Sequence, residues 1–384
     1  MVARVARLPN WVAAVLPALL IAALVFGFVK LDPIGSLREV PPVEAIAFER
    51  TVLTEGHISL HVRNDGPDPV TIAQVMIDDA YWNHEIGDRT LGRLESTSID
   101  ADYPWAAGNP LSIGLVTSTG IVIQHNIEVA SLSPSLDGST LGIYALLGLY
   151  IGVIPIAVGL LWFPALRRAS QKWLTFFLAF TVGLLVFLLV DTVSEGLDIA
   201  NQTAAALNGL GVFFIGALLA VSGLAWLSSA LDAQRKVTSG LLLAYLIASG
   251  IGLHNLGEGL AVGAALTSGE VALGTFLVVG FALHNTTEGL AIVAPLGAEE
   301  ERPGLRHFVA LGAIAGLPTI LGAWAGGFAF SPVWGSFAFG IAAGAIAQVI
   351  WAISRSMRER AGSGAAVLGF CVGLVAMYAT GLLA

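Results

Sequence analysis

The sequence predicts a mainly α-helical membrane protein with one small β-rich domain near its N-terminus. Apolar residues make up 56% of the 384 residues, and charged residues make up only 12%. Several apolar runs exceed the roughly 20 residues that a helix needs to span a bilayer. One long segment, residues 31–140, is polar and alternates in the manner of β-strands. We therefore predict an anchor at 1–30, a β-rich domain with its linker at 31–140, and a helical bundle at 141–384.

The first apolar run, residues 11–29, is predicted to be a membrane anchor. It follows two basic residues, Arg4 and Arg7, as the apolar part of a signal peptide would. The run is long, however, and no small-x-small cleavage site precedes Lys30. We expect an uncleaved helix whose N-terminus lies in the cytoplasm.

The segment 31–140 is predicted to fold as a small antiparallel β-sandwich. Apolar and polar residues alternate at 58–63 and at 121–129, which is typical of strands with one buried face. Turn-forming sequences rich in Asn, Asp, Gly and Pro separate the runs. The pattern indicates about seven short strands, the number found in the simplest sandwiches. The stretch 131–140, rich in Ser, Pro and Gly, is expected to be the linker into the bundle.

Eight further apolar runs follow, and each is predicted to cross the membrane. Their approximate bounds are 141–165, 173–195, 205–229, 238–265, 271–296, 308–330, 337–354 and 364–383. If the β-rich domain lies outside, all ten basic residues of the bundle fall in inside connections, as the positive-inside rule requires. We expect a multi-pass protein of the cell (inner or plasma) membrane. Residues 31–140 and the C-terminus are then extracytoplasmic.

Charge is distributed unevenly along the chain. The segment 31–140 holds 16 acidic and 5 basic residues, which more than accounts for the net charge of −9. We expect the lipid bilayer as a partner and no nucleic acid, because nucleic-acid-binding surfaces are basic. The acidic excess keeps the domain soluble or concentrates cations near the membrane. Its histidines, His57, His61, His84 and His125, lack ligand spacing, and we expect them to be ordinary surface residues.

The pattern His-Asn-x-x-Glu-Gly occurs twice, at 254–259 and at 284–289, each time inside an apolar run. Positions i and i+4 share one face of a helix, so each His is expected to pair with the Glu of its own motif. Ionisable groups in membrane helices are costly and usually mark an ion or substrate path. The predicted metal ligands are His254, Asn255, Glu258, His284, Asn285 and Glu288.

This donor set suits a divalent metal ion. Imidazole and carboxylate groups bind Zn²⁺, Fe²⁺ or Mn²⁺, and two carboxylates balance the charge of the ion. The amides of Asn255 and Asn285 either add oxygen ligands or orient the carboxylates. The glycines that follow the two glutamates, Gly259 and Gly289, allow neighbouring helices to approach closely. The structural alternative is a bundle stabilised by two His–Glu pairs.

With these two motifs, residues 141–384 resemble the ZIP (Zrt-, Irt-like protein) family of divalent-metal transporters. The resemblance rests on the number of spans, their orientation and the motifs on the fourth and fifth spans. It implies an eight-helix bundle with inverted repeats and a metal site near the middle of the membrane. It also implies import by alternating access and a homodimer. The metal ion is then a substrate, for which we expect Zn²⁺ with Fe²⁺ or Mn²⁺ as alternatives, and no prosthetic group or enzymatic activity is expected.

The chain departs from the family pattern on three other spans. The second span carries Asp191 and Glu195 where the family usually has His-x-x-Pro-Glu, and we expect these acids to form an entrance site. On the sixth span, Thr319 occupies the usual position of a glutamate. The seventh span lacks its usual acid, and Gln348 is a candidate pathway residue there. We therefore expect one main metal site.

Two alternatives come from other functional classes. A non-transporting metal sensor or receptor would use the β-rich domain as its recognition module. An intramembrane metallohydrolase would hold a fixed metal that activates water. The sequence lacks the His-Glu-x-x-His arrangement of many such enzymes. The twin motifs favour an ion path instead.

Overall fold

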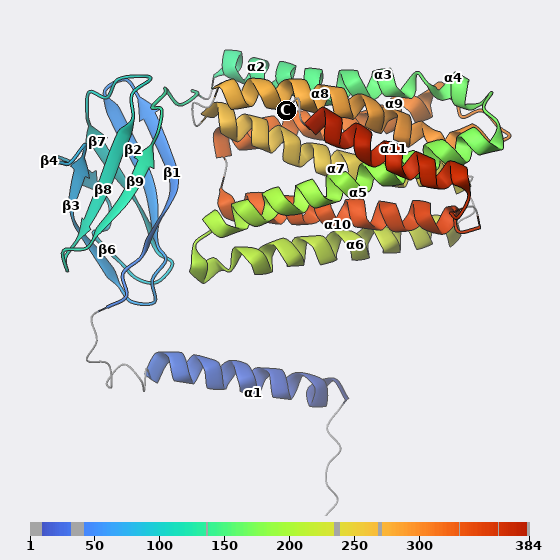
Figure 1. Cartoon of the computed structure of the whole chain (residues 1–384). Coiled ribbons are helices and arrows are strands. Elements are labelled where there is room, and N and C mark those ends of the chain that lie inside the picture. The colour runs from blue at the N-terminus through green and yellow to red at the C-terminus, as the bar shows by residue number, and fades with distance from the viewer. Residues whose placement is uncertain are drawn as a thin grey trace, which may run out of the picture. The chain divides into compact units, whose positions relative to one another are not determined.

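The computed structural model describes residues 10–31, 42–135, 137–233, 239–267, 271–329, 331–359 and 361–381, and Figure 1 labels their helices and strands. Its contacts divide the chain into two units, Met1–Val43 and Glu44–Ala384. The first unit contains the apolar helix α1, Asn10–Leu31. The second contains the β-strands and the helical bundle, which are described separately below.

The β-rich domain consists of two antiparallel sheets around one apolar core (Figure 1). Its strands are β1 (Ile46–Thr54), β2 (His57–Asn64), β3 (Val70–Ile77), β4 (Ala80–Trp82), β5 (Glu85–Ile86), β6 (Thr90–Leu91), β7 (Ser96–Asp102), β8 (Leu111–Thr117) and β9 (Val122–Ile127). One sheet has the order β1-β2-β7-β5, and the other has β4-β3-β8-β9 with β6 beside β3.

The predicted alternation is confirmed in this domain. On β2, Ile58, Leu60 and Val62 are buried, while the residues between them face outward. The described part of the domain has nine strands rather than about seven, because β4, β5 and β6 contain only two or three residues each. Strands of two or three residues are too short to show the alternation of apolar and polar residues from which strands are predicted.

The bundle is formed by long apolar helices joined by short connections. They are α2 (Gly138–Gly148), the π-helical segment η2 (Leu149–Val153), α3 (Ile154–Leu160), α4 (Phe163–Leu166), α5 (Gln171–Gln202), the 3₁₀ segment η3 (Ala205–Leu207), α6 (Gly209–Ala233), α7 (Ser239–Thr267), α8 (Val271–Val293), the 3₁₀ segment η4 (Ala294–Ala298), α9 (Leu305–Ala329), α10 (Pro332–Ser356) and α11 (Gly364–Gly381).

Seven helices in the described part of the chain are long and apolar enough to cross a membrane, which supports a multi-pass membrane protein. They correspond to the first seven of the eight runs predicted for the bundle. The eighth run forms α11, whose apolar stretch Gly364–Ala379 is shorter than the other seven. The predicted anchor is also helical, and its described apolar stretch is Val15–Phe28.

Two predicted spans differ in detail from the structure. The first is not one continuous α-helix, because the π-helical η2 interrupts it and ends two residues before Pro155. The second does not end at residue 195, because α5 continues to Gln202. Asp198, Asn201 and Gln202, which follow the predicted span in the sequence, therefore lie on the helix. Polar residues mark the end of an apolar run but not the end of its helix, since a helix can extend beyond the membrane core.

Close helix contacts position the two motifs. A side chain at Gly259 would overlap the backbone of α9 at Thr319, and a side chain at Gly289 would overlap the backbone of α3 at Ile156. The prediction that these glycines permit close approach is therefore confirmed. Helix α7 packs along α9, α8 packs along α3, α5 packs along α11, and α6 packs along α10. Small residues where two helices cross let their backbones come into contact. In a membrane, van der Waals packing of this kind drives helix association, because the hydrophobic effect does not act between helices in lipid.

Candidate metal site

The two motifs lie on neighbouring helices in the interior of the bundle. Helix α7 carries the first motif, α8 carries the second, and the two helices contact each other. All six predicted ligands are buried, with at most 6% of any one exposed. This burial excludes bulk water from the site, so each polar atom must find a partner within the protein or in a ligand.

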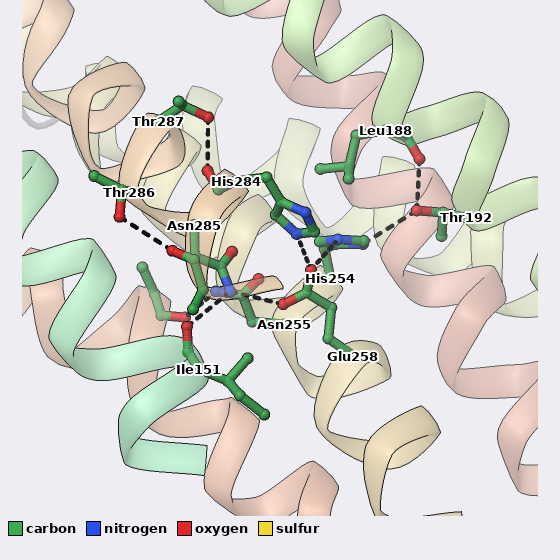
Figure 2. Close-up of polar contacts among 12 residues, drawn as sticks. Ile151, Leu188, Thr192, His254, Asn255, Glu258, His284, Asn285, Thr286 and Thr287 are labelled. Carbon is green, nitrogen blue, oxygen red and sulfur yellow. Dashed lines mark hydrogen bonds and ion pairs between the residues drawn. The ribbon is translucent and has the colours of Figure 1, made fainter. Parts of the chain in front are cut away.

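Two imidazole side chains converge on one carboxylate oxygen (Figure 2). Nε2 of His254 lies 3.2 Å from Oε1 of Glu258, its predicted partner on α7. Nε2 of His284, on α8, contacts the same oxygen. The three candidate ligand atoms lie within 4.8 Å of one another, and among the described residues they form the one such group of three. Two imidazole nitrogens and a carboxylate are typical of sites for Zn²⁺ and similar ions.

The second predicted pair does not form. His284 contacts Glu258 of the neighbouring helix, and Glu288 is outside the group of three. Both carboxylate oxygens of Glu288 are buried without a hydrogen-bond partner. The prediction that residues four apart on one helix face would pair is therefore right for His254 and Glu258. It is wrong for His284, whose partner lies on the neighbouring helix. A contact between helices determines the partner of His284, and periodicity within one helix cannot reveal it.

The two asparagines act through their amide nitrogens. Asn285 donates to Oε2 of Glu258 at 2.8 Å and to the carbonyl of Ile151 at 3.1 Å. Pro155, four residues after Ile151, has no N–H for that carbonyl, so the asparagine supplies the missing donor. Asn255 donates to the carbonyl of Ala315 on α9 at 3.0 Å. The bond to Glu258 matches one of the two predicted roles of Asn285, orientation of a carboxylate, and its Oδ1 stays without a partner.

A second set of buried oxygens lacks hydrogen-bond partners. These atoms are Oδ1 of Asn255, Oδ1 of Asn285, both carboxylate oxygens of Glu288 and Oγ1 of Thr319. Leaving a buried polar group unpaired costs about 1–3 kcal/mol, and more for a charged group. A buried carboxylate that stays ionised also needs a positive counter-charge in a low-dielectric environment. Each of these oxygens therefore has lone pairs available to a cation or to a donor on a bound ligand.

Thr192, which was not predicted as a site residue, lies on α5 and is 1% exposed. Its Oγ1 lies 3.1 Å from Nδ1 of His254, on the side of the ring opposite the candidate ligand atom. The residue is adjacent to Asp191, but it occupies a different face of the helix. Its position in the sequence, between the two predicted entrance acids Asp191 and Glu195, was the signal that could have identified it.

The predicted entrance residues lie along the same helix. Asp191 is exposed and Glu195 is half-buried, two turns before the end of α5. The charge of Glu195 interacts with those of Asp191, Asp198 and Glu258. Acidic side chains therefore lie along the last three turns of α5, and Glu195 is close enough to Glu258 for their charges to interact.

The two predicted pathway residues have different environments. Thr319 is fully buried, and a side chain at Gly152 of η2 would overlap it, so it lies where α9 meets η2. Gln348 is half-buried on α10, which packs against α5, α6 and α7. Neither belongs to the group of three around Glu258.

The histidines of the β-rich domain make separate contacts. His57 lies between two aspartates, with Nδ1 2.9 Å from Asp102 and Nε2 3.4 Å from Asp100. Hydrogen bonds to these acids raise the pKa of the imidazole. His125 is half-buried rather than an ordinary surface residue, because its ring stacks on Phe48 and burial lowers its pKa.

Comparisons with models of known protein families and with curated proteins find no match for this chain.

Proposed function

We propose that this chain is a divalent-metal transporter of the ZIP type, which carries Zn²⁺ across the membrane through the buried site on α7 and α8. Fe²⁺ and Mn²⁺ are the alternative substrates. The observation that carries the proposal is the convergence of His254 and His284 on Oε1 of Glu258. Three protein ligands leave room in the coordination shell, so the ion can exchange ligands as it passes.

The pairing of the helices supports an inverted-repeat architecture. Counting bundle spans from α2, the first packs on the fifth and the sixth packs on the fourth. The second packs on the eighth, and the seventh packs on the third. If span 1 is exchanged with span 6, 2 with 7, 3 with 8 and 4 with 5, each of these packed pairs becomes another of the four. The bonds from Asn285 to Ile151 and from Asn255 to Ala315 obey the same exchange. Two related halves around a central site are the common design of alternating-access transporters.

The direction of transport follows from the distribution of charge. Asp191, Glu195 and Asp198 lie on the side that the basic residues assign to the outside. A cation would be attracted to these acids first and would then reach Glu258. We propose that the ion enters from this side and leaves toward the basic cytoplasmic connections.

Uptake into proteoliposomes tests the proposal. Vesicles containing the full chain should accumulate Zn²⁺, and Glu258→Ala and His284→Ala should each abolish accumulation. Glu300→Ala is the matched control, because its side chain is exposed in the connection after η4. Absence of uptake by the wild-type chain above empty vesicles would refute transport. Binding without uptake would favour a sensor.

The entrance has its own test. Glu195→Gln should slow uptake at low Zn²⁺ concentration while leaving equilibrium binding to the detergent-solubilised protein within a factor of a few. Removal of a guiding charge affects capture of an ion more than its final site. Equal losses of uptake and binding would instead make Glu195 a ligand.

A further inference from the structure

The hydroxyl group of Thr192 has one hydrogen, and the helix already uses it. Oγ1 lies 2.7 Å from the carbonyl oxygen of Leu188, four residues earlier on α5 (Figure 2). A carbonyl oxygen only accepts, so the hydroxyl must donate to it. The oxygen of Thr192 then has only lone pairs to offer to any other partner.

That partner is the imidazole of His254. Nδ1 of His254 lies 3.1 Å from Oγ1 of Thr192, and both residues are buried. Because the hydroxyl has no second hydrogen, the hydrogen of this bond must come from the ring. Nδ1 of His254 is therefore protonated, and Nε2 is the nitrogen that remains for a metal ion.

We infer that Thr192 is a positioning residue that holds His254 in the tautomer whose Nε2 binds the metal. The inference rests on the proposed function for its consequence, but not for the hydrogen bond itself. Nε2 of His254 is directed at Oε1 of Glu258, 3.2 Å away. Any proton between these two atoms is the one that an arriving ion displaces. Metal-binding histidines commonly have their second nitrogen fixed by such a partner, and loss of that partner weakens binding about 10- to 100-fold.

The helix α5 thereby gains a role at a site built on α7 and α8. It contributes no ligand to the group of three, yet it sets which nitrogen faces the ion. A shift of α5 relative to α7 that broke this contact would weaken the site without moving any ligand. The affinity of the site for the metal ion therefore depends on how α5 packs against α7.

Three variants test the inference. Thr192→Val keeps the shape of the side chain and removes the hydroxyl, whereas Thr192→Ser keeps the hydroxyl. Thr181→Val is the matched control, because the hydroxyl of buried Thr181 donates to the carbonyl of Phe177 on the same helix at 3.0 Å. It removes the same kind of helix bond at a different position on α5.

The readouts are histidine ¹⁵N NMR of the full chain in micelles and equilibrium Zn²⁺ binding. The His254 signals are assigned by their loss in His254→Gln. In the wild type, Nδ1 should stay protonated before and after Zn²⁺ is added, and Nε2 alone should shift on binding. Thr192→Val should abolish this preference and lower Zn²⁺ affinity about 10- to 100-fold. Thr192→Ser should restore both, and Thr181→Val should change neither.

The outcomes separate the inference from the proposed function. An unchanged Nδ1 signal in Thr192→Val, or wild-type Zn²⁺ affinity in that variant, would overturn the inference. A loss of affinity in Thr181→Val equal to that in Thr192→Val would assign the effect to helix stability and would also overturn it. If the wild type binds no Zn²⁺, the proposed function fails, and the NMR signals alone decide the role of Thr192.

Discussion

Asn285 on α8 donates a hydrogen bond of 2.8 Å from its amide nitrogen to Oε2 of Glu258 on α7. Its other amide hydrogen bonds to the carbonyl of Ile151 in η2. One side chain thus orients the carboxylate of the site and ties α8 to the first span. Because Oε2 is occupied, Oε1 is the oxygen that faces His254 and His284.

Replacement of Asn285 by alanine should lower Zn²⁺ affinity about 10- to 100-fold, the usual cost of losing a hydrogen bond to a metal ligand. Competition with a chelating dye in detergent measures the change. Asn255→Ala is the matched control, since the amide nitrogen of Asn255 bonds to Ala315 rather than to Glu258. A smaller loss of affinity in Asn285→Ala than in Asn255→Ala would contradict the orienting role.

Glu288 should matter for transport more than for binding. It is outside the group of three and has no hydrogen-bond partner among the described residues. We therefore expect Glu288→Gln to retain one bound Zn²⁺ per chain and to reduce uptake more than tenfold, because a moving ion loses a counter-charge. Isothermal titration gives the stoichiometry, and proteoliposome flux gives the rate. Loss of the single bound ion in Glu288→Gln, as expected for Glu258→Gln, would make Glu288 a primary ligand.

The sequence predicted the elements of the site better than their contacts. Apolar runs with His and Glu four residues apart identified α7 and α8, and burial of all six motif residues agrees with that prediction. Alternation in the β-rich domain predicted its buried strands for the same reason, since local periodicity reports which face is buried. The ends of α5 and the interruption at η2 were not predicted, because they depend on packing and on a single proline.

Contacts between helices leave no periodic pattern in the sequence. The bond of His284 to Glu258 rather than Glu288 depends on how α7 and α8 are aligned along their axes. The contact of Thr192 with His254 likewise depends on the approach of α5 to α7. Neither alignment can be read from one chain segment, because each is fixed by the fit of two helix surfaces.

Gly289 should contribute to the stability of the bundle. A methyl group there would lie 2.8 Å from Cα of Gly159 and would overlap the carbonyl of Ile156, so α8 and α3 would have to separate. Overpacking of this kind typically costs about 1–3 kcal/mol. We expect Gly289→Ala to lower the midpoint of thermal unfolding in detergent. Gly223→Ala is the control, because a methyl group at Gly223 on α6 meets no atom within 4 Å. Equal midpoints for the two variants would show that the crossing tolerates a side chain.

The β-rich domain should lose stability in mild acid because of His125. Burial against Phe48 lowers the pKa of this imidazole from 6.5, and Oγ1 of Thr51 lies 3.1 Å from its Nε2. Between the lowered pKa and about 6.5, the unfolded chain binds a proton that the folded domain does not bind. The contribution of this group to the free energy of unfolding is thus fully present above about pH 6.5. It falls as the pH drops below that value and is lost once the pH has dropped through the folded pKa.

Hydrogen exchange of β1 and β9 in the full chain measures this loss, once rates are corrected for the intrinsic effect of pH. Protection should fall below about pH 6.5 in the wild type, the range in which an unfolded histidine becomes protonated. His125→Asn should reduce the pH dependence, because the buried titrating ring is gone. His61→Asn is the control, since His61 on β2 is exposed. A pH dependence in His125→Asn as steep as in the wild type would assign the acid sensitivity to another group.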